Sequence, residues 1–168
     1  MTRRRLVIIL WSAALIGAAF LIWRVFFPGD KVRIVRTLEA AAAALEIEDG
    51  ESKPAALAKI HRLELRLDDG IDVQLRFNRQ IYTGRYERRD AMAALAALRN
   101  AGVKLKVKLS DFNVTVSGDT AHAEAAATVT GRRNGEEFSL QEDLEVDLVR
   151  RKDEWLISKI AIRNFMEK

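Results

Sequence analysis

Apolar residues recur along this chain with two different periods, and each period predicts a different kind of element. Over 30–50 and again over 52–60 they return every three to four positions, which predicts two helices. Each segment begins with a residue that commonly caps the N-terminus of a helix. A third helix is predicted over 91–100, with Asp90 as its N-cap and Gly102 just beyond its end.

Elsewhere apolar and polar residues alternate, which predicts strands. The alternation over 63–67 and 71–77 predicts a hairpin, with a three-residue loop in which Gly70 takes the left-handed position. After the third helix the same period predicts an antiparallel meander joined by short turns. The strands of this meander are 103–117, 120–133, 136–151 and 155–164.

The turns of the meander predict which residues face each other. With Asn134-Gly135 as a two-residue turn, Ala127 lies opposite Glu142 and His122 lies opposite Asp147. The apolar residues of these strands then share one face of the sheet. His122 and Asp147 lie on the other face, where we expect a surface ion pair and no catalytic role for the histidine.

Two irregularities of the meander are also expected. Apolar residues occupy odd positions before Ser110 and even positions after it, so a bulge is predicted near this residue. The loop over 152–154 is taken as three residues, which pairs Trp155 with Arg151.

An apolar run occupies 6–27, with Arg24 as its one charged residue, and it is long enough to span a membrane as a helix. The three arginines before it predict a cytoplasmic N-terminus, residues 1–5. Residues 28–168 would then form a periplasmic or other extracytoplasmic domain, held in the lipid of the inner membrane by one pass. A cleaved signal peptide is the alternative, but its small-residue cleavage site would fall inside the apolar run.

The net charge of +4 comes from the N-terminal segment, where four arginines lie in or beside the apolar run. The rest of the chain is formally neutral, so no nucleic-acid partner is expected. The chain has no cysteine, which excludes disulfides, thiolate catalysis and cysteine metal sites. Its two histidines lack the spacing of metal ligands, so neither a metal nor another cofactor is expected.

Lys104, Lys106 and Lys108 alternate along one predicted strand and therefore share a face of it. An anionic partner would explain them, and so would a solvated face whose charges are balanced by carboxylates. The neutrality of the domain favours the balanced face.

Glu142 interrupts the predicted apolar face, where a carboxylate is costly unless it is paired or lies at the mouth of a cavity. The predicted registers place Ala127 on one side of it and Asn164 on the other. The small alanine leaves room and the amide offers a hydrogen bond. The sequence therefore predicts that Glu142 and Asn164 contact a ligand or partner at a cavity mouth.

The predicted order is helix, helix, two strands, helix and four antiparallel strands. With Gly84-Arg85 before the third helix and the closing segment 152–157 (KDEWLI), this order resembles the nuclear transport factor two-like, or SnoaL-like, superfamily over about 30–164. The resemblance implies an α+β cone, in which a curved, mostly antiparallel sheet rolls around three helices. In this chain one transmembrane helix would precede the cone.

Members of this superfamily include isomerases, dehydratases, hydrolases, ligand binders and assembly domains. Catalytic members place acid and base residues deep in the cone, and here Tyr82 and Tyr86 are the candidates near the third helix. We include both tyrosines in the predicted cavity-mouth site. No catalytic pair matches residue by residue, so no catalytic residue is assigned and an enzyme is not the leading expectation.

The leading expectation is a membrane-anchored domain without catalysis, which assembles with envelope proteins or binds a ligand, either alone or as a homo-oligomer. The alternative is a small-molecule-binding or catalytic domain that uses the cavity of the cone. An apolar cavity with several converging ionisable groups would favour the alternative. A cavity filled by side chains would favour assembly.

Overall fold

The structure is a computed structural model, and it describes residues 29–77, 80–133 and 135–163. The predicted anchor at 6–27 and the predicted site residue Asn164 lie outside these ranges, so both stay predictions. Across the described ranges, no helix is both long enough and apolar enough to cross a membrane.

The described ranges hold the three expected helices: α2 (Asp30–Leu45), α3 (Lys53–Glu64) and α4 (Arg88–Asn100). The hydroxyl of Ser52 caps α3 by accepting a hydrogen bond from the backbone N–H of Ala55 at 3.4 Å. Gly102, with φ of +67°, follows the end of α4 as predicted. However, α4 begins three residues earlier than expected, because Glu87 rather than Asp90 occupies its N-cap.

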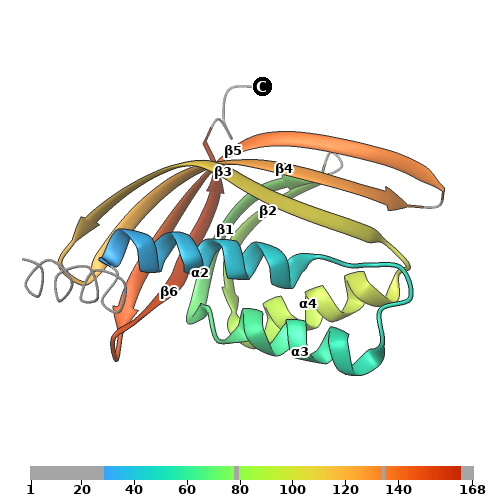
Figure 1. The fold of residues 1–168 in the computed structure, drawn as a ribbon, viewed down its shortest axis with the longest axis horizontal. Coiled ribbons are helices and arrows are strands. Elements are labelled where there is room, and N and C mark those ends of the chain that lie inside the picture. The colour runs from blue at the N-terminus through green and yellow to red at the C-terminus, as the bar shows by residue number, and fades with distance from the viewer. Residues whose placement is uncertain (1–28, 78–79, 134, 164–168) are drawn as a thin grey trace, which may run out of the picture.

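Six strands form one sheet in the order β2-β1-β6-β5-β4-β3. Their bounds are β1 (Leu67–Phe77), β2 (Gln80–Glu87), β3 (Lys104–Ser117), β4 (Thr120–Arg133), β5 (Glu136–Arg151) and β6 (Glu154–Ile162). β1 and β6 pair in parallel, whereas the other neighbouring strands pair antiparallel. The sheet curves over the three helices (Figure 1), which confirms the α+β fold.

The predicted hairpin between 63–67 and 71–77 is wrong. Leu63 belongs to α3, and the segment from Asp68 to Gly70 lies inside β1, whose hairpin partner is β2. Leu63, Leu65 and Leu67 are two positions apart, which fits a strand. Leu63 and Leu67 are also four positions apart, and this spacing fits the buried side of a helix. In the structure the helix ends between these two leucines. Asp68 can lie buried in a strand because Arg151 pairs with it at 3.0 Å.

The predicted register of β4 and β5 is confirmed. Ala127 pairs with Glu142, and His122 pairs with Asp147, with 2.6 Å between the ring Nδ1 and the carboxylate. The bulge expected near Ser110 is also present, and Asp111 takes a left-handed φ of 56° there.

The turn between β5 and β6 differs from the prediction. It has two residues, Lys152 and Asp153, with φ values of 50° and 65°, so Trp155 pairs with Arg150 and not with Arg151. Positive φ at both central positions is typical of the tight hairpin turn that matches strand twist. A register shift after Asp147 then restores the predicted pairing farther along the strands.

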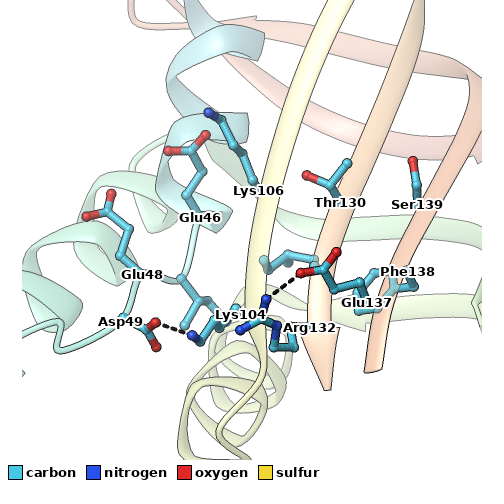
Figure 2. A pocket seen from close by; sticks show the side chains of 13 residues that line it. Glu46, Glu48, Asp49, Lys104, Lys106, Thr130, Arg132, Glu137, Phe138 and Ser139 are labelled. Carbon is cyan, nitrogen blue, oxygen red and sulfur yellow. Dashed lines mark hydrogen bonds and ion pairs between the residues drawn. The ribbon is translucent and has the colours of Figure 1, made fainter. Parts of the chain in front are cut away.

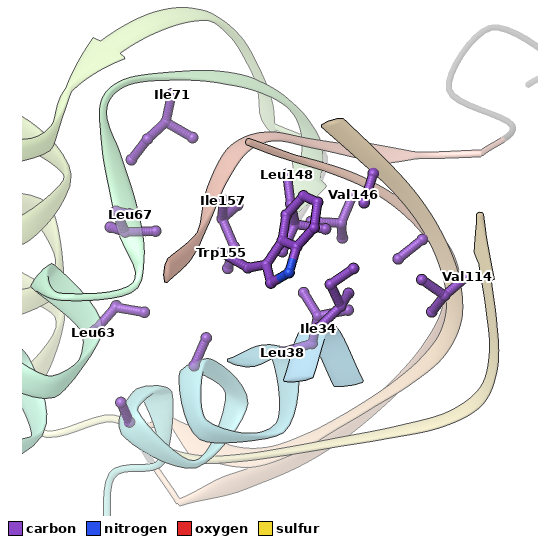
Figure 3. Close-up of a cluster of buried hydrophobic side chains, with 14 of the residues drawn as sticks. Ile34, Leu38, Leu63, Leu67, Ile71, Val114, Val146, Leu148, Trp155 and Ile157 are labelled. Atoms are coloured by element: carbon purple, nitrogen blue, oxygen red, sulfur yellow. The ribbon is translucent and has the colours of Figure 1, made fainter. Parts of the chain in front are cut away.

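The core lies between α2 and the concave face of the sheet. Trp155 is 2% exposed and stands at its centre, packed among Ile34 and Leu38 of α2 and Leu148 of β5 (Figure 3). Its indole N–H donates to the carboxylate of Asp30 at 3.2 Å. Side chains, Trp155 above all, therefore fill the part of the cone next to α2.

Candidate functional site

Glu142 lies on the predicted face of the sheet but is not enclosed. It shares the face of Val146 and Leu148, opposite to the face of His122 and Asp147. Its side chain is exposed and lines a shallow pocket of about 310 Å³. This location agrees with the rim of a cavity, and the role of Glu142 in binding stays a prediction.

Tyr82 and Tyr86 come from β2 at the edge of the sheet, where they pair with Leu75 and Ile71 of β1. Strands β1 and β6 lie between β2 and the strand that carries Glu142. At about 4.8 Å per strand, this separates the backbones by roughly 14 Å. The structure therefore does not bring the two tyrosines next to Glu142.

A larger groove, which we call the edge groove, has a volume of about 850 Å³ and lies where β3 meets the segment after α2 (Figure 2). The segment after α2 is extended instead of helical, and Ile47 exchanges two backbone hydrogen bonds with Leu105 of β3 at 2.8 and 3.1 Å. This contact adds a short wall to the edge of the sheet. The groove is lined by Glu46, Ile47, Glu48, Asp49, Lys104, Leu105, Lys106, Thr130, Gly131, Arg132, Glu137, Phe138 and Ser139.

Two cross-strand rows of polar side chains line the edge groove. In the first, Lys104 lies opposite Arg132, which in turn lies opposite Glu137. This row is neutralised, because Lys104 pairs with Asp49 and Arg132 pairs with Glu137. The hydrogen bond and charge of that second pair lower the pKa of the Glu137 carboxyl and raise the pKa of the Arg132 guanidinium.

The second row is not neutralised. Lys106 lies opposite Thr130, and Thr130 lies opposite Ser139, so an ammonium and two hydroxyls stand on neighbouring strands (Figure 2). Within the described part of the chain, Lys106 has no hydrogen bond or ion pair. The hydroxyls of this row can donate to an acceptor of a bound molecule, and so can Lys106, whose side chain runs toward Glu46 (Figure 2). Leu105 and Phe138 occupy alternate positions of the same strands and therefore lie on the other face of the sheet.

A buried ionic cluster holds the wall of the edge groove in place. Arg99 of α4 donates to the carbonyls of Ala44 at 2.7 Å and Glu46 at 3.1 Å, and its guanidinium also pairs with Glu51. Lys59 lies 2.7 Å from a Glu51 oxygen and donates to the Glu46 carbonyl at 3.2 Å. The C-terminal ends of α2 and α4 are thus tied to α3 beneath the wall.

The lysines on one side of this groove were predictable from the sequence, whereas the extended wall on its other side was not. The alternating lysines of β3 were recognised, and pairing of Lys104 with Asp49 agrees with a balanced face. The expected first helix, however, ran to Gly50 and would have carried Glu46 and Ile47 away from the sheet. The extended conformation of Glu46, with ψ of 135°, was the missing feature.

No group of three or more acidic, histidine or cysteine side chains suited to a metal occurs in the described ranges. Two further ion clusters lie at the opposite end of α2 and beside β1. Arg150 joins Asp30 and Asp119, and Arg151 joins Asp68. The hydrogen bond from Arg151 holds the pKa of the Asp68 carboxyl below its usual value.

The chain matches one family of known proteins. A family model described as a SnoaL-like domain matches residues 64–161. No curated protein matches the chain. The structure of the Kfla4162 protein from Kribbella flavida superposes with a TM-score of 0.66 at 17% sequence identity, covering 79% of this chain and 88% of that one.

Two similar structures come from Novosphingobium aromaticivorans. One is provisionally named an aromatic ring hydroxylase, with a TM-score of 0.64, 15% identity and coverage of 79% of this chain and 87% of that one. The other is provisionally named a scytalone dehydratase, with a TM-score of 0.61, 14% identity and coverage of 80% and 83%. At these identities the likeness shows the fold.

These findings correct the leading functional expectation. A domain without catalysis, for assembly in the cell envelope, was expected. The family match and the names of the similar structures instead support the alternative, a small-molecule-binding or catalytic role. The edge groove agrees with this alternative, because several ionisable groups converge on it.

Proposed function

This chain belongs to the SnoaL-like domain family, and from that premise we propose that it binds a small organic molecule in the edge groove, as its ligand or substrate. The observation that carries the proposal is the row of Lys106, Thr130 and Ser139, an ammonium and two hydroxyls on one face of the sheet within the groove. Small-molecule sites combine a mostly apolar surface of roughly 300–1,000 Å³ with a few polar groups that orient the ligand. The groove, at about 850 Å³, has this size, and its lining is richer in polar groups than that of a typical site.

The charges of the groove indicate which kind of molecule fits. Lys104 and Arg132 are already paired with carboxylates, so the unpaired ammonium of Lys106 is the cation that can meet a ligand. A carboxylate, phenolate or carbonyl oxygen would accept from it and from the neighbouring hydroxyls. The proposed ligand therefore carries an oxygen acceptor that meets this row.

Replacing Lys106 with methionine is expected to weaken binding about tenfold or more, because a hydrogen bond to a charged group contributes about 1.5–3 kcal/mol. The matched control is Lys108→Met, since Lys108 is two residues along β3, exposed and outside the groove lining. The measurement is an NMR titration of the chain with a panel of aromatic and alicyclic carboxylic acids and ketones. The same panel is followed for turnover.

The expected perturbations map to the groove, and Lys108→Met binds like the unaltered chain. Equal affinity of the Lys106→Met and Lys108→Met variants for every bound compound would contradict the proposal. Glu142→Gln is measured in the same titration, because the sequence predicts a contact at the cavity mouth. If Glu142→Gln weakens binding and Lys106→Met does not, the ligand binds in the shallow pocket beside Glu142 instead of the edge groove.

We also propose that 6–27 anchors this domain in the inner membrane, with residues 1–5 in the cytoplasm and the domain in the periplasm or its equivalent. The length of the apolar run and the preceding arginines support this arrangement. A periplasm-dependent phosphatase fused after Lys168 is expected to be active, and a reporter that works only in the cytoplasm is expected to be inactive there. The opposite pattern would overturn the topology.

A further inference from the structure

A second groove, which we call the helix groove, lies between the first turns of α2 and the neighbouring part of β3. Its volume is about 450 Å³. Val32, Val35 and Phe112 give it an apolar surface, and Val32 is 46% exposed. Lys31 and Arg36 flank this surface, and neither makes an ion pair within the described ranges. Exposed apolar side chains between unpaired cations are typical of surfaces that contact phospholipid.

The distance along the chain places this groove near the membrane. The apolar run ends at Phe27 and α2 begins at Asp30, so Pro28 and Gly29 alone lie between them. Three residue steps span at most about 11 Å. If the run crosses the bilayer, the first turn of α2 must lie within that distance of the anchor's end.

The other cations at this end of α2 are already engaged. Arg150 pairs with Asp30 and Asp119, and Arg33 donates to the backbone carbonyl of Asp153. These contacts hold the β3–β4 and β5–β6 turns beside the N-terminus of α2 (Figure 1). The free positive charge beside the apolar surface therefore comes from Lys31 and Arg36, while Glu39 lies farther along the helix.

We infer that the helix groove is a phospholipid-binding surface, with its apolar side chains at the headgroup–acyl boundary and Lys31 and Arg36 against lipid phosphates. This inference rests on the proposed membrane anchor. It also orients the domain. The helix groove lies at the start of α2, and α2 is 16 residues, or about 24 Å, long. The edge groove begins at Glu46, just beyond the other end of α2, and would open to water, away from the bilayer.

The test uses the full chain in nanodiscs of phosphatidylcholine, with or without phosphatidylglycerol. Because the chain has no cysteine, Val32→Cys carries a fluorophore at one position of the groove. Leu57→Cys is the matched control, since Leu57 is also an exposed apolar residue, 66% exposed, on α3. We expect spin-labelled lipid to quench the label at 32 several-fold more than the label at 57, and aqueous iodide to show the reverse order.

Charge reversal separates lipid binding from simple proximity. Lys31→Glu combined with Arg36→Glu is expected to reduce lipid quenching at position 32 several-fold in discs with phosphatidylglycerol, because each basic residue near anionic lipid adds attraction. Lys53→Glu, at the start of α3, is the matched control and is expected to change nothing.

Retention of the chain in membranes after alkaline carbonate distinguishes the two ways of failing. If the chain is retained while labels at 32 and 57 respond alike, the lipid surface is wrong and the anchor stands. If carbonate releases the chain, the anchor is wrong and the inference fails with it.

Discussion

Replacing Trp155 with alanine is expected to lower the free energy of unfolding by about 3–5 kcal/mol, the range for large aromatic residues removed from a packed core. Trp155 is 2% exposed and packs against Ile34 and Leu148, which are fully buried. The replacement also removes the hydrogen bond to Asp30 and the stacking of the Arg150 guanidinium, 5.0 Å from the ring centroid. Because α2 contacts the sheet through this side chain, the loss concerns the whole domain.

The measurement is chemical denaturation of the domain starting at Gly29, followed by circular dichroism. Trp155→Phe keeps an aromatic ring in the core and should lose clearly less than Trp155→Ala. Leu57→Ala, at an exposed position of α3, should change stability by less than about 0.5 kcal/mol. A loss below about 1 kcal/mol for Trp155→Ala would mean that the indole does not organise this core.

Replacing Arg99 with methionine is expected to cost about 1–3 kcal/mol, because it removes donors from two buried carbonyls and leaves Lys59 as the remaining counter-charge of Glu51. The Arg99 side chain is 6% exposed, and that of Glu51 is 10% exposed. Arg99 also satisfies the carbonyls of Ala44 and Glu46, which end α2 and begin the wall of the edge groove. We therefore expect ligand binding to weaken together with stability.

The matched variant is Arg99→Lys, which keeps the charge but cannot donate to Glu51 and both carbonyls at once. It should fall between the unaltered chain and Arg99→Met in the same denaturation experiment. If Arg99→Met unfolds at the same denaturant concentration as the unaltered chain, the cluster does not contribute to stability.

The pH dependence of stability tests the same cluster. Burial by itself would raise the pKa of the Glu51 carboxyl, but the hydrogen bond from Lys59 and the charge of Arg99 hold this pKa below its ordinary value of 4.5. A carboxyl whose pKa is lowered by folding stabilises the fold above its unfolded-state pKa. That contribution is lost as the pH falls through the lower folded-state value. The stability difference between the unaltered chain and Glu51→Gln should therefore be largest above pH 4.5 and shrink in acid.

The local elements of this protein were predictable from its sequence, because their determinants lie within a few residues. The strands β4 and β5 pair from Arg133 opposite Glu136 onward, so Ala127 opposite Glu142 followed from the predicted turn length alone. The bulge after Ser110 followed from a change in apolar phase, and the cap at Ser52 from its own side chain. These features agreed with each other, which also made the superfamily resemblance recognisable.

Tertiary contacts decided the elements whose local pattern fits two structures. Leu63 suits either a helix or a strand, and its place in α3 became clear only with β1 paired to β6, far away in sequence. The wall of the edge groove depends on Ile47 meeting Leu105 and on Arg99 reaching the carbonyl of Glu46. Such contacts join residues some fifty positions apart, and a backbone hydrogen bond or a buried guanidinium leaves no periodic trace in the residues beside it. The sequence therefore determined the strands that carry the site, whereas the packing of helix ends against the sheet edge decided where the site opens.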